Sequence, residues 1–475
     1  MIIIYIACSL LISGILFFNR NESLRKLLVI LFLILQCLFT GYEFTHKGIS
    51  EFNYFKPDAL AILLLITLTI ISIPALLHSY DYIYKEKDNP KSRSIYYVAM
   101  IILIMALSAA YLSSHIAITW IFVEITTLSA SVLIFHRRNA GSIEATWKYI
   151  FVCSISLAFV FIGILFLSIA LGDASDESLH YETLVSLSPG LDTFWLRLAF
   201  IFIFSGFTAK LGLVPMYTAG IDAKDKAPTP SAALFSSVLM NVGFIGVFRF
   251  YEIMAHSSLH QWTNYVLMFA AFLSIFIATV YMLKVKNIKR MLAYSSIEHM
   301  GIVIFGIAVG GIGYYAAILH LILHSFAKSS LFLQIGHLYK TYQTKNIYFI
   351  GNYFKYNLPG AVFILIAFIC ITAMPPSGLF ISEFYIFKAA FEAHYLFVLI
   401  PLLVLLTFII WAMGKNIFKI LFIPPVDFNE DRIEKVNVYE TLSQFVLMGL
   451  IIYLGLTPPA FFVDFIREAI NHLTY

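Results

Sequence analysis

Several ionisable side chains lie inside long apolar stretches of the sequence, where a charge is costly to bury. They are Glu124, Lys210, His320, His324, Lys328 and Glu383. A charged side chain at the centre of a membrane helix costs a few kcal/mol, so such residues are functional candidates by default. Carboxyl, amino and imidazole groups all bind and release protons. The pattern therefore predicts a row of side chains that exchange protons through water inside an apolar protein.

Glu124 and Lys210 form the first candidate pair. Glu124 lies in the stretch WIFVEITT, and Lys210 comes directly before GLVP. Burial disfavours the charged form of a lysine and a nearby carboxylate favours it, so relative movement of the two groups would release or take up a proton. The alternative is a static ion pair that joins two helices. Because buried ion pairs stabilise poorly compared with apolar packing, we favour proton transfer.

His320, His324 and Lys328 follow one another at intervals of four residues. On a helix this spacing places all three on one face. Two histidines four residues apart can also bind a metal ion, but no acid or cysteine on that helix completes a ligand set. A second alternative is that the histidines are hydrogen-bonded core residues. We interpret the face as part of the proton path and predict no metal.

Weaker candidates are Lys388, Glu144, Lys148, Glu298 and His299. Lys388 follows Glu383 by more than one turn, and either joins the path or extends toward the membrane surface. Glu144 and Lys148 are four residues apart, which favours a structural ion pair. Glu298 and His299 are placed near the inner end of a helix, in a polar cluster.

The sequence shows no signature of a bound cofactor. The four cysteines lie far apart in apolar runs and offer neither a CxxC pair nor an iron–sulfur or disulfide framework. No Walker A pattern, GxxxxGK[ST], occurs, and no haem or flavin signature is present. We therefore predict no cofactor, and expect the energy to come from an ion gradient or a partner protein.

The composition explains where these side chains sit. Of the 475 residues, 60% are hydrophobic and only 12% are charged, whereas a soluble domain carries about 25% charge. The mean hydropathy is +0.87. A surface this apolar is not tolerated in water, which excludes a soluble enzyme. We predict an all-α integral membrane protein whose surroundings are the lipid bilayer, with no nucleic-acid partner.

The apolar runs predict fourteen membrane helices, because a bilayer core needs about 20 apolar residues per span. They cover residues 2–18, 24–44, 58–78, 95–113, 115–135, 145–171, 193–220, 229–251, 263–284, 291–310, 313–339, 358–392, 395–422 and 438–457. Residues 458–475 resemble an amphipathic helix at the membrane interface.

The loop charges predict the orientation of these helices. With the N-terminus outside, most of the 31 lysine and arginine residues fall in cytoplasmic loops, among them Lys87, Lys224, Arg432 and Lys435. The outer loop of residues 172–192 carries only acidic charges, three of them at Asp173, Asp176 and Glu177. This bias predicts both termini outside, in the inner (cytoplasmic) membrane of a bacterium or archaeon.

Two of the predicted helices contain helix breakers at membrane depth. The seventh carries KLGLVP and the twelfth carries MPPSG. The breaks fall in the fourth helix of two successive groups of five, and five is odd, so the groups should be inverted repeats. The predicted parts are an N-terminal three-helix segment (1–94), two five-helix repeats (95–251 and 263–422), and a C-terminal helix with an interfacial helix (423–475).

Four sequence segments resemble the antiporter-like subunits of respiratory complex I. They are SGFTAKLGLVPMYTAGIDAKDKAPTPSAAL (205–234), NIKRMLAYSSIEHMG (287–301), HSFAKSSLF (324–332) and MPPSGLFISEF (374–384). The same family includes multi-subunit sodium/proton antiporters and membrane-bound nickel–iron hydrogenases of the formate-hydrogenlyase type. The strings SSIEHMG, MPPSGLFISEF and IEATWKY (143–149) resemble the hydrogenase-type branch most.

The resemblance implies a role for each candidate. Glu124 and Lys210 match the glutamate–lysine pair of helices 5 and 7. His320, His324 and Lys328 match the polar positions of helix 11, and Glu383 matches the charged residue of broken helix 12. In LMNVGF (239–244), Asn241 stands where many quinone-reductase relatives carry lysine. An amide holds water but does not carry a proton, so Asn241 should be a wetted relay point.

The resemblance also implies a function. We expect an ion-translocating subunit, for protons or sodium, in a redox-driven complex such as a quinone oxidoreductase or membrane-bound hydrogenase. Its partners would be other membrane subunits and, through them, a peripheral redox module. Because the chain ends soon after helix 14, we expect an inner or lone antiporter-like subunit. The alternatives are a secondary cation/proton antiporter subunit and a membrane scaffold for a soluble enzyme.

Overall fold

A computed structural model of the chain describes residues 1–85, 89–172, 179–426 and 438–473. Within these ranges the chain is mostly helical and forms no β-strand beyond isolated bridges. The all-α prediction is therefore confirmed. Six charges used to predict the orientation, Lys87, Asp173, Asp176, Glu177, Arg432 and Lys435, lie outside the described residues.

The helices have the following bounds: α1 (Ile2–Phe18), α2 (Glu22–Thr45), α3 (Ala59–Lys85), α4 (Pro90–Leu112), α5 (Ile116–Phe135), α6 (Ala140–Leu171), α7 (Tyr181–Leu187), α8 (Thr193–Leu211), α9 (Thr218–Lys226), α10 (Thr229–Phe235), α11 (Val238–Ala255), α12 (His260–Met282), α13 (Ile288–Val309), α14 (Ile312–Tyr342), α15 (Tyr353–Tyr356), α16 (Leu358–Ile371), α17 (Gly378–Glu392), α18 (Leu396–Phe422), α19 (Val438–Leu456) and α20 (Ala460–Ile470). In the described ranges, 12 helices are long and apolar enough to cross a membrane, and α1 and α16 are shorter apolar helices. The count of fourteen spans stays a prediction.

Both predicted interruptions are present. Helix α8 ends at Leu211, where Gly212 adopts the left-handed conformation with φ of +81°, and the chain becomes helical again in α9. Helix α16 ends at Ile371, and α17 begins six residues after Thr372 with Ser377 as its N-cap. The breaks contain the cis bonds Val214–Pro215 and Pro375–Pro376. Each break places helix ends beside an ionisable side chain.

Two elements differ from the sequence prediction. The predicted helix 229–251 is divided into α10 and α11 by a turn at Ser236 and Ser237. The segment between α6 and α8 contains the short helix α7, and a helix of seven residues is too short for a hydropathy pattern to predict. Polar residues set many helix starts: the Asp192 carboxylate accepts hydrogen bonds from Phe194 N and Trp195 N, and caps α8.

The chain divides into two compact units. The first contains residues 1–231, 238–266 and 465–475, and the second contains residues 232–237 and 267–464. One broken helix lies in each, α8 and α9 in the first unit, and α16 and α17 in the second. The predicted part boundaries and the inverted repeat stay predictions.

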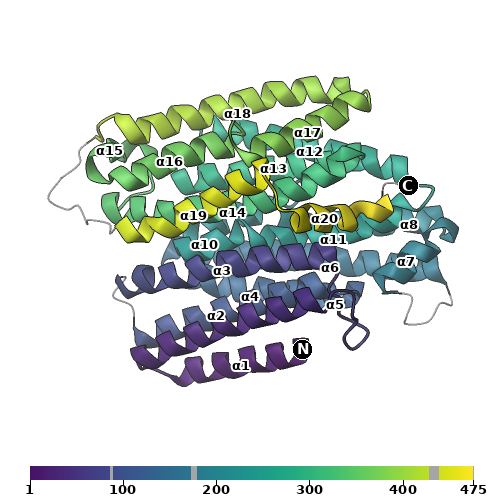
Figure 1. The fold of residues 1–475 in the computed structure, drawn as a ribbon, viewed down its shortest axis with the longest axis horizontal. Helices are drawn as coiled ribbons and strands as arrows, with labels where there is room; N and C mark the ends of the chain where they lie inside the picture. The colour runs from purple at the N-terminus through teal and green to yellow at the C-terminus, as the bar shows by residue number, and fades with distance from the viewer. Residues whose placement is uncertain (86–88, 173–178, 427–437, 474–475) are drawn as a thin grey trace. The chain divides into compact units, whose positions relative to one another are not determined.

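In the first unit, α1, α2, α3 and α4 pack side by side (Figure 1), and α6 packs along α8. The α6–α8 contact depends on glycines, because a Cβ at Gly206 would clash with the Ser156 carbonyl oxygen and one at Gly163 with Ile203. Small residues let two membrane helices approach closely. This close contact brings the end of α8, which carries Lys210, against α6.

In the second unit, α14 is the central helix. It contacts α13, α17 and α19, and nearly all of its 31 residues are buried. Its polar side chains His320, His324 and Lys328 therefore face other helices and not lipid. A helix that is buried all round, yet carries ionisable groups, is typical of a functional core.

The end of α20 and the residues after it pack within the first unit through aromatic and polar contacts. Phe465 stacks on Phe44 at 5.5 Å, Lys47 donates to Glu468 at 2.5 Å, and His472 Nε2 lies 2.7 Å from Glu252 Oε1. The helix predicted within residues 458–475 is thus present. The hydrogen bond to Glu252 raises the pKa of His472 above 6.5, although partial burial opposes this shift.

We expect the docking of residues 465–473 to weaken as the pH rises. A raised pKa means that the protonated imidazole binds better, so the contact is complete below the ordinary pKa and is lost as the pH passes the raised one. Hydrogen exchange of this segment, corrected for the intrinsic rate, should be faster at about pH 9 than at about pH 6. The variant His472→Gln should lose this dependence. Equal protection at both values in the native chain would contradict the expectation.

Candidate functional site

The first cluster of candidate side chains surrounds Lys210 in the first unit. Lys210 lies at the end of α8 and is 5% exposed. Its Nζ donates a hydrogen bond to the Tyr149 hydroxyl of α6 at 3.0 Å and lies 5.0 Å from the centre of that ring. A lysine this deeply buried needs polar partners to remain charged, and Tyr149 supplies one. No local feature of the sequence distinguishes Tyr149 from other tyrosines, because its contact with Lys210 depends on the packing of α6 on α8.

Glu124 of α5 lies near Lys210 without a direct ion pair. Among the described residues no ion pair within 4.0 Å joins the two charged groups, but Glu124 acts electrostatically on both Lys210 and Tyr149. One carboxylate oxygen of Glu124 is buried without a hydrogen-bond partner. The three side chains thus come from three adjacent helices, with Tyr149 in direct contact with the lysine. Glu124 and Lys210 therefore do not form a direct salt bridge in this structure.

Helix α11 is held against the same turn of α8. A Cβ added at Gly243 would clash with Leu211 N and would lie 2.9 Å from the carbonyl carbon of Lys210. Only glycine permits this approach of two backbones. Asn241 lies two residues earlier on α11 and is fully buried. The structure therefore places Asn241 on a helix that touches the backbone of Lys210.

Lys224 is a buried lysine that the sequence analysis counted among the loop charges. It lies in α9 and is 4% exposed, and its Nζ is 3.1 Å from the Met240 sulfur on α11. The predicted loop position is wrong, because the chain after the break in α8 resumes as a helix that packs on the unit. A buried ammonium group beside a thioether is poorly solvated, which makes Lys224 a further candidate for proton exchange.

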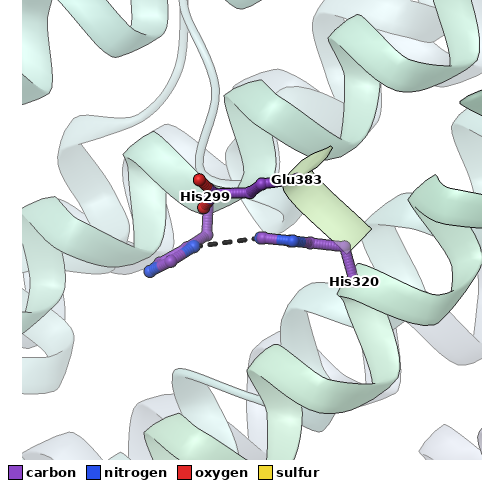
Figure 2. Close-up of side chains that lie close together, drawn as sticks. All are labelled: His299, His320 and Glu383. Carbon is purple, nitrogen blue, oxygen red and sulfur yellow. Dashed lines mark hydrogen bonds between the residues drawn. The ribbon is translucent and has the colours of Figure 1, made fainter. Parts of the chain in front are cut away.

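The second cluster lies in the second unit, where α13, α14 and α17 meet. It contains His299 of α13, His320 of α14, and Ser382 and Glu383 of α17. Figure 2 shows the His299 and His320 rings facing each other, with the Glu383 carboxylate beside His299. The two rings are fully buried, and Glu383 is 8% exposed. His299 lies in the middle of α13, not near its end as the sequence analysis placed it.

Hydrogen bonds run through this cluster in one direction. Ser382 Oγ donates to the Leu379 carbonyl at 2.9 Å, so it accepts from His320 Nδ1, also at 2.9 Å. His320 Nε2 then carries a lone pair and accepts from His299 Nδ1 at 3.0 Å. His299 Nε2 is buried without a hydrogen-bond partner, 3.9 Å from Glu298 Oε2. If both rings are neutral, the lone pair at the end of this chain lies on His299 Nε2.

Other candidates surround this chain. The His324 ring lies 5.1 Å from the His299 ring, and Lys328 Nζ donates to the Leu292 carbonyl at 3.1 Å. Glu298 accepts from Ser295 at 3.4 Å and acts electrostatically on Glu383. The predicted face of α14 and the weaker candidates Glu298 and His299 therefore belong to one buried cluster.

Three of these side chains also offer a donor set for a metal ion. One donor atom from each of His299, His320 and Glu383 lies within 4.8 Å of the others. Two imidazoles and a carboxylate suit a divalent ion such as zinc. His299 Nδ1 and His320 Nε2 are, however, 3.0 Å apart, which is a hydrogen-bond distance. One nitrogen of each ring is therefore already paired. This geometry agrees with a metal-free pair of histidines.

The remaining candidates lie apart from both clusters. The Lys388 side chain is 49% exposed and lies 3.7 Å from Glu392, one turn later on α17. Glu144 and Lys148 form an exposed pair on α6 with the predicted i, i+4 spacing. Exposed pairs of this kind contribute little to stability and are poor candidates for a buried path.

The sequence of this chain is similar to those of several known membrane proteins. The family model described as "NADH:quinone oxidoreductase/Mrp antiporter, TM" matches residues 113–409. The hydrogenase-4 component F homolog of Methylacidiphilum infernorum is 30% identical over 391 residues, which cover 80% of each chain. Subunit M of the NADH-quinone oxidoreductase of Rickettsia prowazekii is 24% identical, over 93% of this chain and 92% of the relative.

A solved structure shows the same fold. A chain of the membrane-bound sulfane sulfur reductase, an archaeal respiratory membrane complex, superposes with a TM-score of 0.87 at 20% identity. The match covers 100% of this chain and 97% of that chain. The similarity thus extends over the helices of both clusters.

Proposed function

The chain belongs to the NADH:quinone oxidoreductase/Mrp antiporter family of membrane proteins, and from this premise we propose that it carries protons across a membrane. It is an antiporter-like integral membrane subunit of the complex I and membrane-bound hydrogenase type, close to hydrogenase-4 homologues. In our proposal the chain has no redox centre of its own. Partner membrane subunits and a peripheral redox module would therefore supply the energy.

The hydrogen-bonded chain from His299 to Ser382 is the observation that carries this proposal. A proton arriving at His299 Nε2 releases the Nδ1 proton to His320 Nε2, and His320 in turn holds a proton on Nδ1 facing Ser382. Glu298, whose carboxylate oxygen lies 3.9 Å from His299 Nε2, would deliver the proton, with Lys328 as a further source. His320 would then be protonated on both nitrogens and would lose one proton to the Glu383 carboxylate, which lies within 4.8 Å of a ring nitrogen of each histidine, a gap that one water can bridge.

In the first unit, Lys210 would store and release the proton. Loss of the proton is favoured by burial, and its return is favoured by the Glu124 carboxylate. The Tyr149 hydroxyl holds the amine in place in both forms, since it can accept from an ammonium group or donate to a neutral amine. Lys224 and Asn241 would extend this part of the path.

The cluster chemistry favours protons over sodium. Neutral imidazoles linked by hydrogen bonds pass protons from ring to ring, whereas hard cations such as sodium need several oxygen ligands. The purified complex should be reconstituted in vesicles with a pH-sensitive dye and driven by its redox substrate. Proton uptake that persists without sodium supports the proposal. Uptake that requires sodium, or an absence of uptake during redox turnover, would favour the antiporter or the scaffold alternative.

Asn241 should hold water and not a charge. Replacing Asn241 with leucine removes the amide that can orient water beside the Lys210 turn, so proton uptake should slow by roughly tenfold, the cost of about one lost hydrogen bond. Replacing it with lysine should be tolerated, since the ammonium group also binds water. Initial rates in vesicles containing each variant complex would test this. A native rate in Asn241→Leu would remove α11 from the path.

We also propose that both termini face outward from the inner membrane of a bacterium or archaeon. Reporter fusions after Lys91, in the first turn of α4, and after Glu182, in α7, should report opposite sides of the membrane. The physical reason is the excess of basic residues in the loops assigned to the cytoplasm. Cytoplasmic signals from both fusions would disprove this orientation.

A further inference from the structure

A groove in the first unit lies at one end of α2, α3 and α4, far in sequence from both clusters. Its volume is about 370 Å³. Its polar wall comes from the start of α2, the end of α3 and the start of α4, and includes Arg25, Lys26 and Arg93 with Glu22 and Asp81. Figure 1 shows these three helices side by side. Helix ends of membrane spans lie near the headgroup layer, so the groove opens at a membrane surface.

Arg25 is the residue that suggests a ligand. The side chain is 5% exposed, and its Nη2 donates to the Pro90 carbonyl and to Ser94 Oγ, both at 3.3 Å. Its Nε is buried and has no hydrogen-bond partner. A guanidinium group that lines a groove and is fixed by only two long hydrogen bonds can receive an anionic oxygen.

The described residues that line the groove carry a positive excess. Three of them are basic and two are acidic, and Glu22 is already engaged by the Tyr80 hydroxyl and lies 3.7 Å from Lys26. Lys26 Nζ also lies over the Tyr80 ring at 4.1 Å. Arg25 is therefore the buried positive charge of the groove that no acidic side chain contacts in an ion pair within the described ranges.

The other wall of the groove is apolar. Val29 and Ile30 of α2 and Leu76 and Leu77 of α3 line it further along the two helices. Ile30 is 49% exposed and Leu77 is 53% exposed. A molecule that fits both walls has an anionic head and a hydrocarbon tail parallel to the helices.

We infer that this groove binds an anionic phospholipid of the surrounding membrane, with its phosphate against Arg25 and an acyl chain along Ile30 and Leu77. The phosphate accepts from the guanidinium group of Arg25, which lines the groove, and the acyl chain covers the exposed apolar side chains. The combination of charge and chain distinguishes this lipid from a zwitterionic lipid and from free phosphate.

The test measures lipid binding to the full chain, purified in detergent and depleted of lipid. Native mass spectrometry with added phosphatidylglycerol should show one high-affinity lipid, with weaker binding of phosphatidylcholine and no displacement by inorganic phosphate. The variant Arg25→Gln should weaken phosphatidylglycerol binding about fivefold or more, because one buried cation is lost. Lys91→Gln removes an exposed basic residue of α4 outside the groove and should bind as the native chain does.

A second variant separates the groove from the folding role of Arg25. Leu77→Trp fills the apolar wall, leaves every charge in place, and should also abolish the high-affinity lipid. Native binding by Arg25→Gln or by Leu77→Trp would overturn the inference, as would equal affinity for the two lipids. The purified native complex should retain more phosphatidylglycerol than the Arg25→Gln complex. Equal retention would mean that a partner subunit fills the groove.

Discussion

Replacing Lys210 with methionine is expected to reduce proton translocation roughly a hundredfold or more, the usual effect of losing a positioned proton-transfer group. Methionine preserves the length and apolar stem of the side chain but cannot hold a proton. The hydrogen bond to Tyr149 and the attraction to Glu124 are lost together. Redox-driven proton uptake in reconstituted vesicles measures the effect, and co-purification of the other subunits measures assembly.

The variant Lys210→Arg distinguishes a proton carrier from a static charge. Arginine keeps the positive charge beside Tyr149 but does not deprotonate in proteins, so it should assemble normally and translocate as poorly as methionine. Glu124→Gln should also stop translocation while leaving assembly intact. Lys388→Met, which changes an exposed lysine on α17, serves as the matched control and should be native. Native translocation by Lys210→Arg would reduce Lys210 to a structural charge.

Replacing His320 with glutamine should have a comparable effect in the second unit. Glutamine can still hydrogen-bond to His299 and Ser382, but an amide cannot accept a proton at one end while releasing one at the other. We therefore expect translocation to fall by roughly a hundredfold with little loss of stability. Vesicle assays together with thermal unfolding of the purified complex would measure both quantities.

Two further variants identify the reason for any loss at His320. Ser382→Ala removes the acceptor for His320 Nδ1 and should slow translocation, because the ring loses the partner that fixes its tautomer. Ser330→Ala is the control, because it removes another fully buried hydroxyl of the second unit. The Ser330 hydroxyl donates to the Ala327 carbonyl of its own helix, so this variant should translocate normally. If His320→Gln translocates at the native rate, His320 is a core residue with a satisfied hydrogen bond and not a carrier.

The two units differ in how the side chains that we propose as proton carriers are held. Lys210 has one direct hydrogen-bond partner, the Tyr149 hydroxyl, and Glu124 acts on it at longer range. His320 is hydrogen-bonded at both ring nitrogens, to His299 and to Ser382, and the three side chains come from three helices. In our proposal, movement of α5 relative to α8 would therefore change the charge of Lys210, whereas the histidine chain would keep its geometry.

The sequence by itself determined the membrane class, most helix positions and the residues worth testing. Hydropathy and the roughly 20-residue span are local properties, so α2, α5 and α14 could be located from composition alone. The helix breakers in KLGLVP and MPPSG act within a few residues and correctly predicted both interruptions. Glu124, Lys210, His320 and Glu383 were identifiable because a buried charge is expensive wherever it occurs.

Only the tertiary structure decided which of these groups meet. Tyr149 contacts Lys210, and Ser382 contacts His320, across 61 and 62 residues of chain, and neither hydroxyl differs locally from many others. Lys224 appeared to be a loop charge until the packing of α9 buried it against Met240. Hydrophobic patterns fix how deep a side chain lies, but its partners depend on helix contacts such as those at Gly206 and Gly243, which form between segments distant in sequence.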